Sequence, residues 1–371
     1  MKKILILSGA IIVALIGGFI LYSKFFSGSS FSSVNIQLGA VDEKAVAGLC
    51  RDKSGHVRLV CLADELKKTV SGDLLANLQR DYSVSDAQKW SNFPPVGYRN
   101  RIGPTLDKFN PAQLAIIKAI LKEAAGTAAN EGYDEIDQLL NADDYLSGID
   151  KGAGFGSGSF HLAFLGTPAN SGMWQFYFGG HHLAVSLTYK DGKIIGATPS
   201  FRGVEPFGTF TQNGRENQPL NQERDAFAAM LNALDENEKN KAKLSQTFTD
   251  IIVGPRKDNN FPASPNGIRV GDLSREKQEL IIKGIEKYVI DTPDADSKVL
   301  MEKYQSELAD TYIAYSGTTD MNTANDYVRI DGPSVWIEFS MQPSPTLKDG
   351  SVHPHSVWRD KKTDYGGNSS K

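Results

Sequence analysis

Cysteine, histidine and basic runs are scarce in this chain of 371 residues, which has two cysteines, six histidines and a net charge of −4. Two cysteines allow one disulfide at most. A mildly acidic chain without a basic run argues against nucleic acid or anionic lipid as the main partner. The sequence also lacks a Gly-x-Ser-x-Gly elbow, a phosphate-binding loop and a His-Glu-x-x-His helix. The signatures of several common hydrolases and nucleotide-binding proteins are therefore missing.

Charge is absent from one long stretch near the N-terminus, Ile4–Tyr22, which follows Lys2 and Lys3. As a helix this run would span roughly 28 Å, about the thickness of one bilayer core. We therefore predict a signal anchor or signal peptide at residues 1–27, and the lack of a clear Ala-x-Ala site favours the uncleaved anchor. The lysines mark the cytoplasmic side. We expect a cell-envelope protein whose membrane partner is this segment and whose body lies outside the cytoplasm; cleavage would make it secreted or periplasmic.

The two cysteines, Cys50 and Cys61, flank a short polar segment. Two cysteines that close a short loop in an oxidising compartment favour a disulfide, which would stabilise the fold by roughly 2–3 kcal/mol. The alternative is a metal clip made of both cysteines and His56. We assign residues 28–63 to a linker that contains this disulfide loop.

The remaining residues, 64–367, predict one large globular α+β domain. Helical spacing of apolar residues indicates helices at 59–81, 110–121, 134–145, 221–236, 238–247, 274–288 and 294–310. Aromatic and β-branched residues indicate strands at 159–165, 173–178, 181–189, 193–199, 311–315, 326–330, 335–341 and 352–358. Strands joined by hairpins, with helices in blocks, predict an antiparallel β-sheet with helices packed on it.

Two histidines, His353 and His355, lie on either side of Pro354 near the C-terminus. Alternate side chains of a strand share a face. Both imidazoles can therefore reach one point, which is a common way to begin a metal site. Because proline donates no hydrogen bond to a ladder, we expect this strand to be an edge strand or to be interrupted at Pro354.

A second pair, His181 and His182, follows Gly179–Gly180 in the middle of the chain. In a regular strand His181 would share the apolar face of Leu183, and His182 would share the more polar face of Ala184. Such a strand offers one of the two to a site, so His182 is the better ligand and His181 the second choice. A bulge at the glycine pair would change this phase. The alternative is that both histidines are structural.

Metal sites usually add a carboxylate to their imidazoles and fix each ring with outer hydrogen bonds. Glu338 lies in a predicted strand, and Glu205 lies in a turn-rich segment; either is a candidate fourth ligand or general base, and a salt bridge is the alternative for both. Arg359 falls on the face of His353 and His355 if the strand continues. It could bind a carboxylate or phosphate of a substrate, or it could form an Arg–Asp pair that stabilises the chain end.

Four stretches together resemble one family of exported proteins, the one catalogued as domain of unknown function 3500. They are Trp174–Leu183, Pro199–Pro206, Tyr327–Pro333 and the segment from His353 to Gly366 that reads His-x-His-x-x-Trp-Arg-Asp before Asp-Tyr-Gly. The resemblance covers about residues 65–367. It implies that both histidine clusters belong to one domain, and it brings no established activity.

These residues favour an exported metal-dependent enzyme, a hydrolase or an oxidoreductase, that acts on a small substrate, for which an anionic compound is a candidate. His353, His355 and His182 would hold a divalent transition metal, and zinc, iron, manganese and copper all accept such ligands. Zinc or manganese would indicate hydrolysis through an activated water, and iron or copper an oxidation. The alternatives are an envelope protein that binds a metal or small molecule without catalysis, and a structural or interaction domain.

Overall fold

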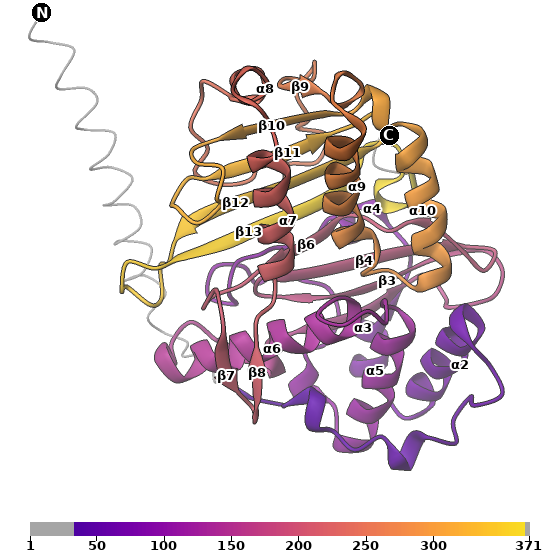
Figure 1. Ribbon diagram of the computed structural model, residues 1–371. Helices are drawn as coiled ribbons and strands as arrows, with labels where there is room; N and C mark the ends of the chain where they lie inside the picture. Colours follow the sequence, from indigo (N-terminus) through magenta and orange to yellow (C-terminus); the bar gives the residue numbers. More distant parts are fainter. Residues whose placement is uncertain (1–32, 368–371) are drawn as a thin grey trace, which may run out of the picture.

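Residues 33–367 are described by the computed structural model, and eleven strands among them form one large sheet (Figure 1). The predicted α+β class is confirmed, because nearly all neighbouring strands are antiparallel and helices cover one face. In this part of the chain no helix is long and apolar enough to cross a membrane. The predicted membrane segment, residues 1–27, lies outside the described residues.

The sheet is made of two antiparallel halves with one short strand between them. Its order is β1-β2-β3-β4-β6-β13-β12-β11-β10-β9, and β5 pairs with β4. The strands are β1 Gln79–Arg80, β2 His161–Leu165, β3 Met173–Gly180, β4 Leu183–Lys190, β5 Lys193–Gly196, β6 Ser200–Gly203, β9 Ile268–Arg269, β10 Tyr312–Ser316, β11 Tyr327–Asp331, β12 Val335–Pro343 and β13 Val352–Asp360. A separate hairpin pairs β7 Phe210–Gln212 with β8 Arg215–Asn217.

Nine α-helices of the described chain lie mainly on one side of this sheet. They are α2 Gly55–Lys68, α3 Gly72–Leu78, α4 Val84–Ala87, α5 Pro111–Glu123, α6 Gly132–Ile149, α7 Asn221–Asn232, α8 Glu236–Ala242, α9 Arg275–Val289 and α10 Asp294–Ser306. The expected start at Asn110 is confirmed: its side chain forms a capping box with Gln113, and Pro111 occupies the first turn. The single helix expected at 59–81 is two helices, because the backbone of Ser71 is extended and Gly72 has a φ of 55°.

The two faces of the sheet have different coverings. On one face Ile337 and Trp358 join the main core with Ile285 of α9, and Figure 1 shows α7, α9 and α10 lying across this half of the sheet. On the other face Phe201 and Val357 pack with Trp90 and Tyr365, which come from irregular segments and a short 3-10 turn. The side chains of His353 and His355 are on this second, loop-covered face.

Because Pro354 has no N–H, we expected it to lie in an edge strand or to interrupt its strand. The first alternative is wrong, because β13 lies inside the sheet, between β12 and β6. The ladder with β6 begins at the pair His355–Gly203, so Pro354 lies one residue beyond it. The pairing with β6 is thus interrupted next to Pro354, while the pairing with β12 continues past it through Met341.

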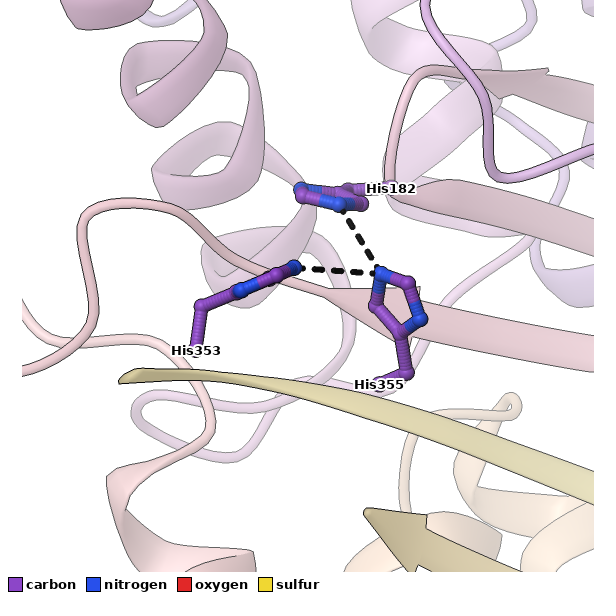
Figure 2. A group of neighbouring side chains, drawn as sticks. All are labelled: His182, His353 and His355. Atoms are coloured by element: carbon purple, nitrogen blue, oxygen red, sulfur yellow. Dashed lines mark hydrogen bonds between the residues drawn. The ribbon is translucent and has the colours of Figure 1, made fainter. Parts of the chain in front are cut away.

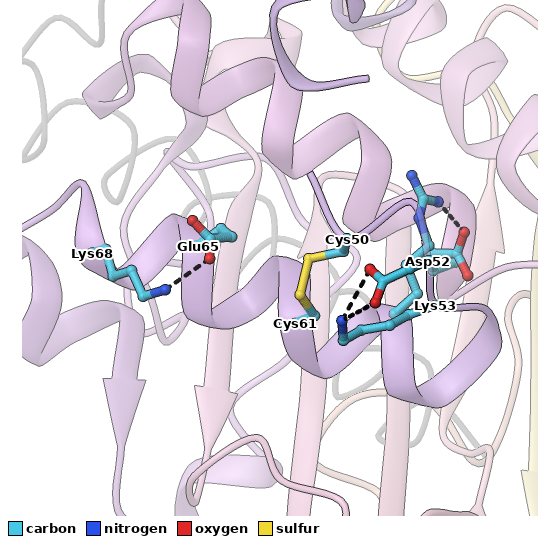
Figure 3. Close-up of a disulfide and its surroundings, with 8 residues drawn as sticks. Cys50, Asp52, Lys53, Cys61, Glu65 and Lys68 are labelled. Carbon is cyan, nitrogen blue, oxygen red and sulfur yellow. Dashed lines mark hydrogen bonds and ion pairs between the residues drawn. A yellow bond between two sulfur atoms is a disulfide. The ribbon is translucent and has the colours of Figure 1, made fainter. Parts of the chain in front are cut away.

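The predicted disulfide is confirmed. Cys50, in the turn before α2, is bonded to Cys61 on α2 (Figure 3). The described part of the segment that we assigned to a linker packs on the body: Leu38 and Val46 belong to the main core, and the Lys118 ammonium on α5 donates to the carbonyls of Gly39 and Val41.

Removing the disulfide should lower stability without changing the fold. The double substitution Cys50→Ala, Cys61→Ala removes the cross-link that restricts the unfolded chain. We therefore expect the free energy of unfolding to fall by about 2–3 kcal/mol. Urea denaturation measures this change, and reduced wild-type protein should match the double variant. Identical midpoints for oxidised wild type and the double variant would contradict the prediction.

Candidate metal centre

His181 and His182 form the two-residue turn between β3 and β4, since Gly180 pairs with Leu183. They are not part of a continuous strand, so the alternation that we used to choose between them does not hold. His182 instead has a left-handed backbone, with a φ of 56°, a conformation in which histidine is one of the less disfavoured residues. Its carbonyl accepts a hydrogen bond of 2.8 Å from the Gly203 amide of β6.

His353 and His355 are held by regular pairing in β13. His355 lies opposite Ser340 of β12 on one side and Gly203 of β6 on the other. Gly203 therefore contacts both histidine-bearing segments, the β3–β4 turn and β13. A single residue of the central strand brings together histidines that are about 170 positions apart in the sequence.

Three imidazole rings converge at this point (Figure 2). The Nε2 atom of His355 is 3.2 Å from Nε2 of His182 and 3.3 Å from Nε2 of His353. One ligand nitrogen of each ring lies within 4.8 Å of the other two. His355, His182 and His353 are 7%, 8% and 2% exposed, respectively. The site therefore lies just beneath the surface and is nearly closed.

These separations match the spacing of ligands around one metal ion. Two nitrogens that are each about 2.0–2.1 Å from a tetrahedral zinc ion lie about 3.3 Å apart. Without a metal, three neutral rings offer one proton each, and the buried Nδ1 atom of His353 has no hydrogen-bond partner. This Nδ1 is a different ring nitrogen from the proposed ligand Nε2, so it marks an incompletely satisfied ring, while the spacing of the Nε2 atoms is the observation that indicates a metal.

Gly203 makes this close approach possible. A Cβ atom at this position would lie 3.1 Å from Cδ2 of both His182 and His355, and 3.0 Å from the Pro354 carbonyl oxygen. Any side chain would therefore press on two of the three rings. A glycine is needed here for close approach, since its φ is not in the left-handed region.

Asp250 and Gln342 fix the ring of His355 from its other side. Nδ1 of His355 is 3.1 Å from the Asp250 carboxylate and 2.6 Å from the amide nitrogen of Gln342, which itself donates to Asp250 over 2.6 Å. Nδ1 either accepts from the Gln342 amide or donates to Asp250, depending on the tautomer, and in the second tautomer the lone pair of Nε2 is directed at the other two rings. A carboxylate on the outer nitrogen of a histidine is the usual way to orient a metal ligand and raise its basicity.

His181 lies beside the cluster but not within it. Its Nδ1 atom is 2.6 Å from the Asp143 carboxylate of α6, and its ring stacks on that of His182 with centroids 3.8 Å apart. The other side of the ring contacts Phe155. His181 therefore supports His182, because its hydrogen bond to Asp143 of α6 fixes the ring on which the His182 ring stacks.

Burial keeps His182 and His353 neutral. Desolvation, followed by the neighbouring histidines, lowers the pKa of His182 well below its ordinary value. The same causes lower the pKa of His353 to about 2. Neutral imidazoles are the form that binds metal, so at neutral pH no proton has to be displaced from these rings.

The structure does not bring Glu338 or Glu205 to the three nitrogens. Glu338 shares the face of the histidines, but its carboxylate is taken up by four donors: the amides of Ile252 and Val253, the Tyr327 hydroxyl and the Trp336 indole. Glu205 accepts from the amides of Thr346 and Leu347 in the β12–β13 connection. Both carboxylates hold loops against the sheet around the site.

Arg359 is also fully committed to other groups. Its guanidinium pairs with Asp364 and Asp258 at 2.7 and 2.5 Å and donates to the Val253 carbonyl. The residue has no exposed surface. This arrangement corresponds to the Arg–Asp pairing that was the alternative to substrate binding.

Asp250 and Asp143, the two carboxylates nearest the histidines, were not predicted from the sequence. Asp143 was hidden on a predicted helix, where acidic residues are usually exposed. Asp250 lies between α8 and β9, in residues 243–267, which contain no helix or strand. A connection of this length is uncommon in a compact domain and often functional, so its length was the one available signal.

A family model described as "Protein of unknown function (DUF3500)" matches residues 53–367. The match starts just before α2 and includes every residue of the histidine cluster. No curated protein and no solved structure matches the chain.

The lowered pKa of His353 gives the metal-free protein a defined pH dependence. Between about pH 6.5, the value for an unfolded histidine, and the folded value of about 2, the unfolded chain binds a proton that the folded chain does not. The free energy of unfolding should therefore fall as the pH falls below about 6.5, by about 1.4 kcal/mol per pH unit for this residue. Above pH 6.5 the residue contributes no slope.

Urea denaturation of chelator-treated wild type and His353→Gln at pH 7.5 and 5.5 isolates this effect, since other groups titrate alike in both proteins. The variant should gain about 1.4 kcal/mol relative to wild type at the lower pH. A difference that does not change with pH would contradict the lowered pKa.

Proposed function

The chain belongs to the DUF3500 family, and we propose that it is a metal-dependent hydrolase whose centre is formed by His182, His353 and His355. The observation that carries this proposal is the convergence of three Nε2 atoms, with Nε2 of His355 lying 3.2 Å from that of His182 and 3.3 Å from that of His353. Zinc is the metal that this spacing favours, since it matches the edge of a zinc-centred tetrahedron. Bound zinc would supply a water of lowered pKa as a nucleophile.

The number of ligands favours catalysis over storage. Structural zinc sites are closed by four protein ligands, whereas catalytic sites have three and keep one position for water or substrate. The cluster offers three imidazoles, and neither Glu338 nor Glu205 joins it. An envelope protein that only sequesters a metal would be expected to complete the coordination.

The surrounding residues have positioning roles in this proposal. Asp250 orients His355 through Nδ1, and Asp143 with His181 fixes the ring of His182. The substrate is small, because the three ligand residues are only 2–8% exposed. We assign no anion-binding role to Arg359, since its guanidinium is buried between two aspartates.

We also propose that the enzyme works outside the cytoplasm. The Cys50–Cys61 disulfide persists in an oxidising compartment. The apolar run Ile4–Tyr22 behind two lysines has the length and flanking charge of an export signal or anchor. Both features point to the cell envelope.

Metal content tests the proposal directly. Protein purified without a polyhistidine tag, exposed to zinc and desalted should retain about one equivalent of metal. His182→Gly should retain almost no metal. The left-handed backbone at this position accepts glycine without strain. His56→Gln is the matched control, because His56 contacts Trp174 and Tyr189 away from the cluster, and it should bind like wild type.

Elemental analysis of protein as first isolated identifies the native metal, and iron or copper there would favour the oxidoreductase. Cobalt substitution tests the open position: the visible spectrum of the cobalt protein should change when azide is added. A spectrum that azide leaves unchanged would favour the storage protein. No retained metal in any sample, after reconstitution, would contradict the metal centre and leave a structural role for the histidines.

Asp250→Asn should weaken metal binding by about ten- to a hundredfold, because it removes the charge that raises the basicity of His355. Asp250 has 46% of its side chain exposed, so the thermal midpoint of the metal-free protein should change little. Competition with a chelating dye measures the affinity, and Asp81→Asn, an exposed aspartate elsewhere, is the control. Equal affinities for both variants would show that Asp250 does not act on the ligand.

A further inference from the structure

A second cluster of titratable groups lies on the other face of the sheet, among the helices. Glu131 caps the N-terminus of α6, Glu135 follows one turn later, and Glu223 comes from the first turn of α7. One carboxylate oxygen of each lies within 4.8 Å of the other two. All three residues are buried, with exposures of 1%, 0% and 1%.

The charges of this cluster do not balance. Asp291, which follows α9, is a fourth buried carboxylate beside it. Arg202 forms ion pairs with Glu135 and Asp291, and Lys287 binds Glu131 at 2.9 Å. Four carboxylates therefore face two cations, which leaves an excess of two negative charges if all are ionised. Uncompensated buried charge is strongly unfavourable, so either protons or a cation must neutralise it.

Glu223 is the residue for which the protein supplies no partner. Glu131 has Lys287, and Glu135 and Asp291 share Arg202, but Glu223 takes part in no ion pair among the described residues, and neither of its oxygens accepts a hydrogen bond. The second oxygen of Glu131 and one oxygen of Glu135 are likewise buried without any partner. Four carboxylate oxygens from three neighbouring residues are thus buried without a partner.

We propose that Glu131, Glu135 and Glu223 bind a hard divalent cation, of the calcium or magnesium class. Such ions take carboxylate oxygens in preference to imidazole nitrogens. One divalent cation would cancel the excess of two negative charges. It would also bind the four carboxylate oxygens that have no partner. Arg202 and Lys287 would keep the ion pairs that they already form.

The electrostatics of the site agree with this assignment. Burial, followed by the neighbouring carboxylates, raises the pKa of Glu223 well above its ordinary value. Burial, followed by the charge of Asp291, also raises the pKa values of Glu131 and Glu135. In the absence of a cation these raised pKa values favour the protonated carboxyl groups, and a divalent ion would displace the protons.

The proposed ion would connect parts of the fold that are distant in sequence. Glu131 and Glu135 belong to α6, Glu223 to α7, and Arg202 to β6, the strand that joins the two halves of the sheet. Arg202 faces the helices, whereas its neighbour Gly203 contacts the histidines on the opposite face. The cation would be structural, and its binding does not depend on the proposed metal centre.

Calcium titration of chelator-treated full-length protein tests this site. Calcium at millimolar concentration should raise the thermal midpoint of wild type by several degrees, and calorimetry should show one binding event that releases protons. Glu223→Gln, which keeps the shape of the side chain, should weaken calcium binding at least tenfold and remove the shift. The His182→Gly variant should keep the full calcium response, which separates this site from the histidine centre.

Glu302→Gln is the matched control, because it removes the same charge from an exposed position of α10 and should respond like wild type. Two results would overturn the proposal. One is a calcium shift of equal size in wild type and Glu223→Gln, since the ion would then bind elsewhere. The other is no calcium or magnesium binding by wild type at millimolar concentration, which would assign protons to the cluster and does not require the variant to fold.

Discussion

The pairing of β6 with two partners at once determines the rest of the site. This four-residue strand pairs with β4 through Leu183 and with β13 through His355. It therefore joins the two halves of the sheet, and the residue at its end, Gly203, has no side chain to keep the flanking histidines apart. The distance of 3.2 Å between His182 and His355 follows from strand spacing and from this one glycine. A site built in this way is preorganised, because the rings are held by sheet pairing and not by a mobile loop.

Polar groups on both faces of β6 depend on the same junction. On the loop-covered face, one ring nitrogen of the histidine cluster, Nδ1 of His353, is buried without a partner. On the helical face, Arg202 faces buried carboxylates that outnumber the available cations. Natural cores satisfy nearly all their buried polar atoms, so incomplete satisfaction on both sides of one strand is informative. We interpret the first cluster as a nitrogen-ligand site for a transition metal and the second as an oxygen-ligand site for a hard cation, in accordance with their donor atoms.

The sequence allowed most of the secondary structure and the histidine ligands to be predicted, and the reasons are local. Helical and alternating patterns gave the class of fold, and His353 and His355 were recognised because a strand places alternate residues together. The arrangement of strands could not be predicted, since β6 is short and carries little pattern. Pro354 suggested an edge that β13 does not have. The choice between His181 and His182 was made from strand phase, whereas in the structure the turn determines their directions. Asp250 and Asp143 approach the histidines through tertiary packing alone, so no sequence spacing reports them.

X-ray absorption spectroscopy, combined with anomalous diffraction at the metal edge of crystalline holoprotein, measures the central geometry most directly. We predict one anomalous peak that is about 2.0–2.1 Å from the Nε2 atoms of His182, His353 and His355. We also predict a first shell of three imidazole nitrogens with one oxygen from water. A peak at another position, or imidazole rings that hydrogen-bond to each other in protein saturated with metal, would contradict the three-histidine centre.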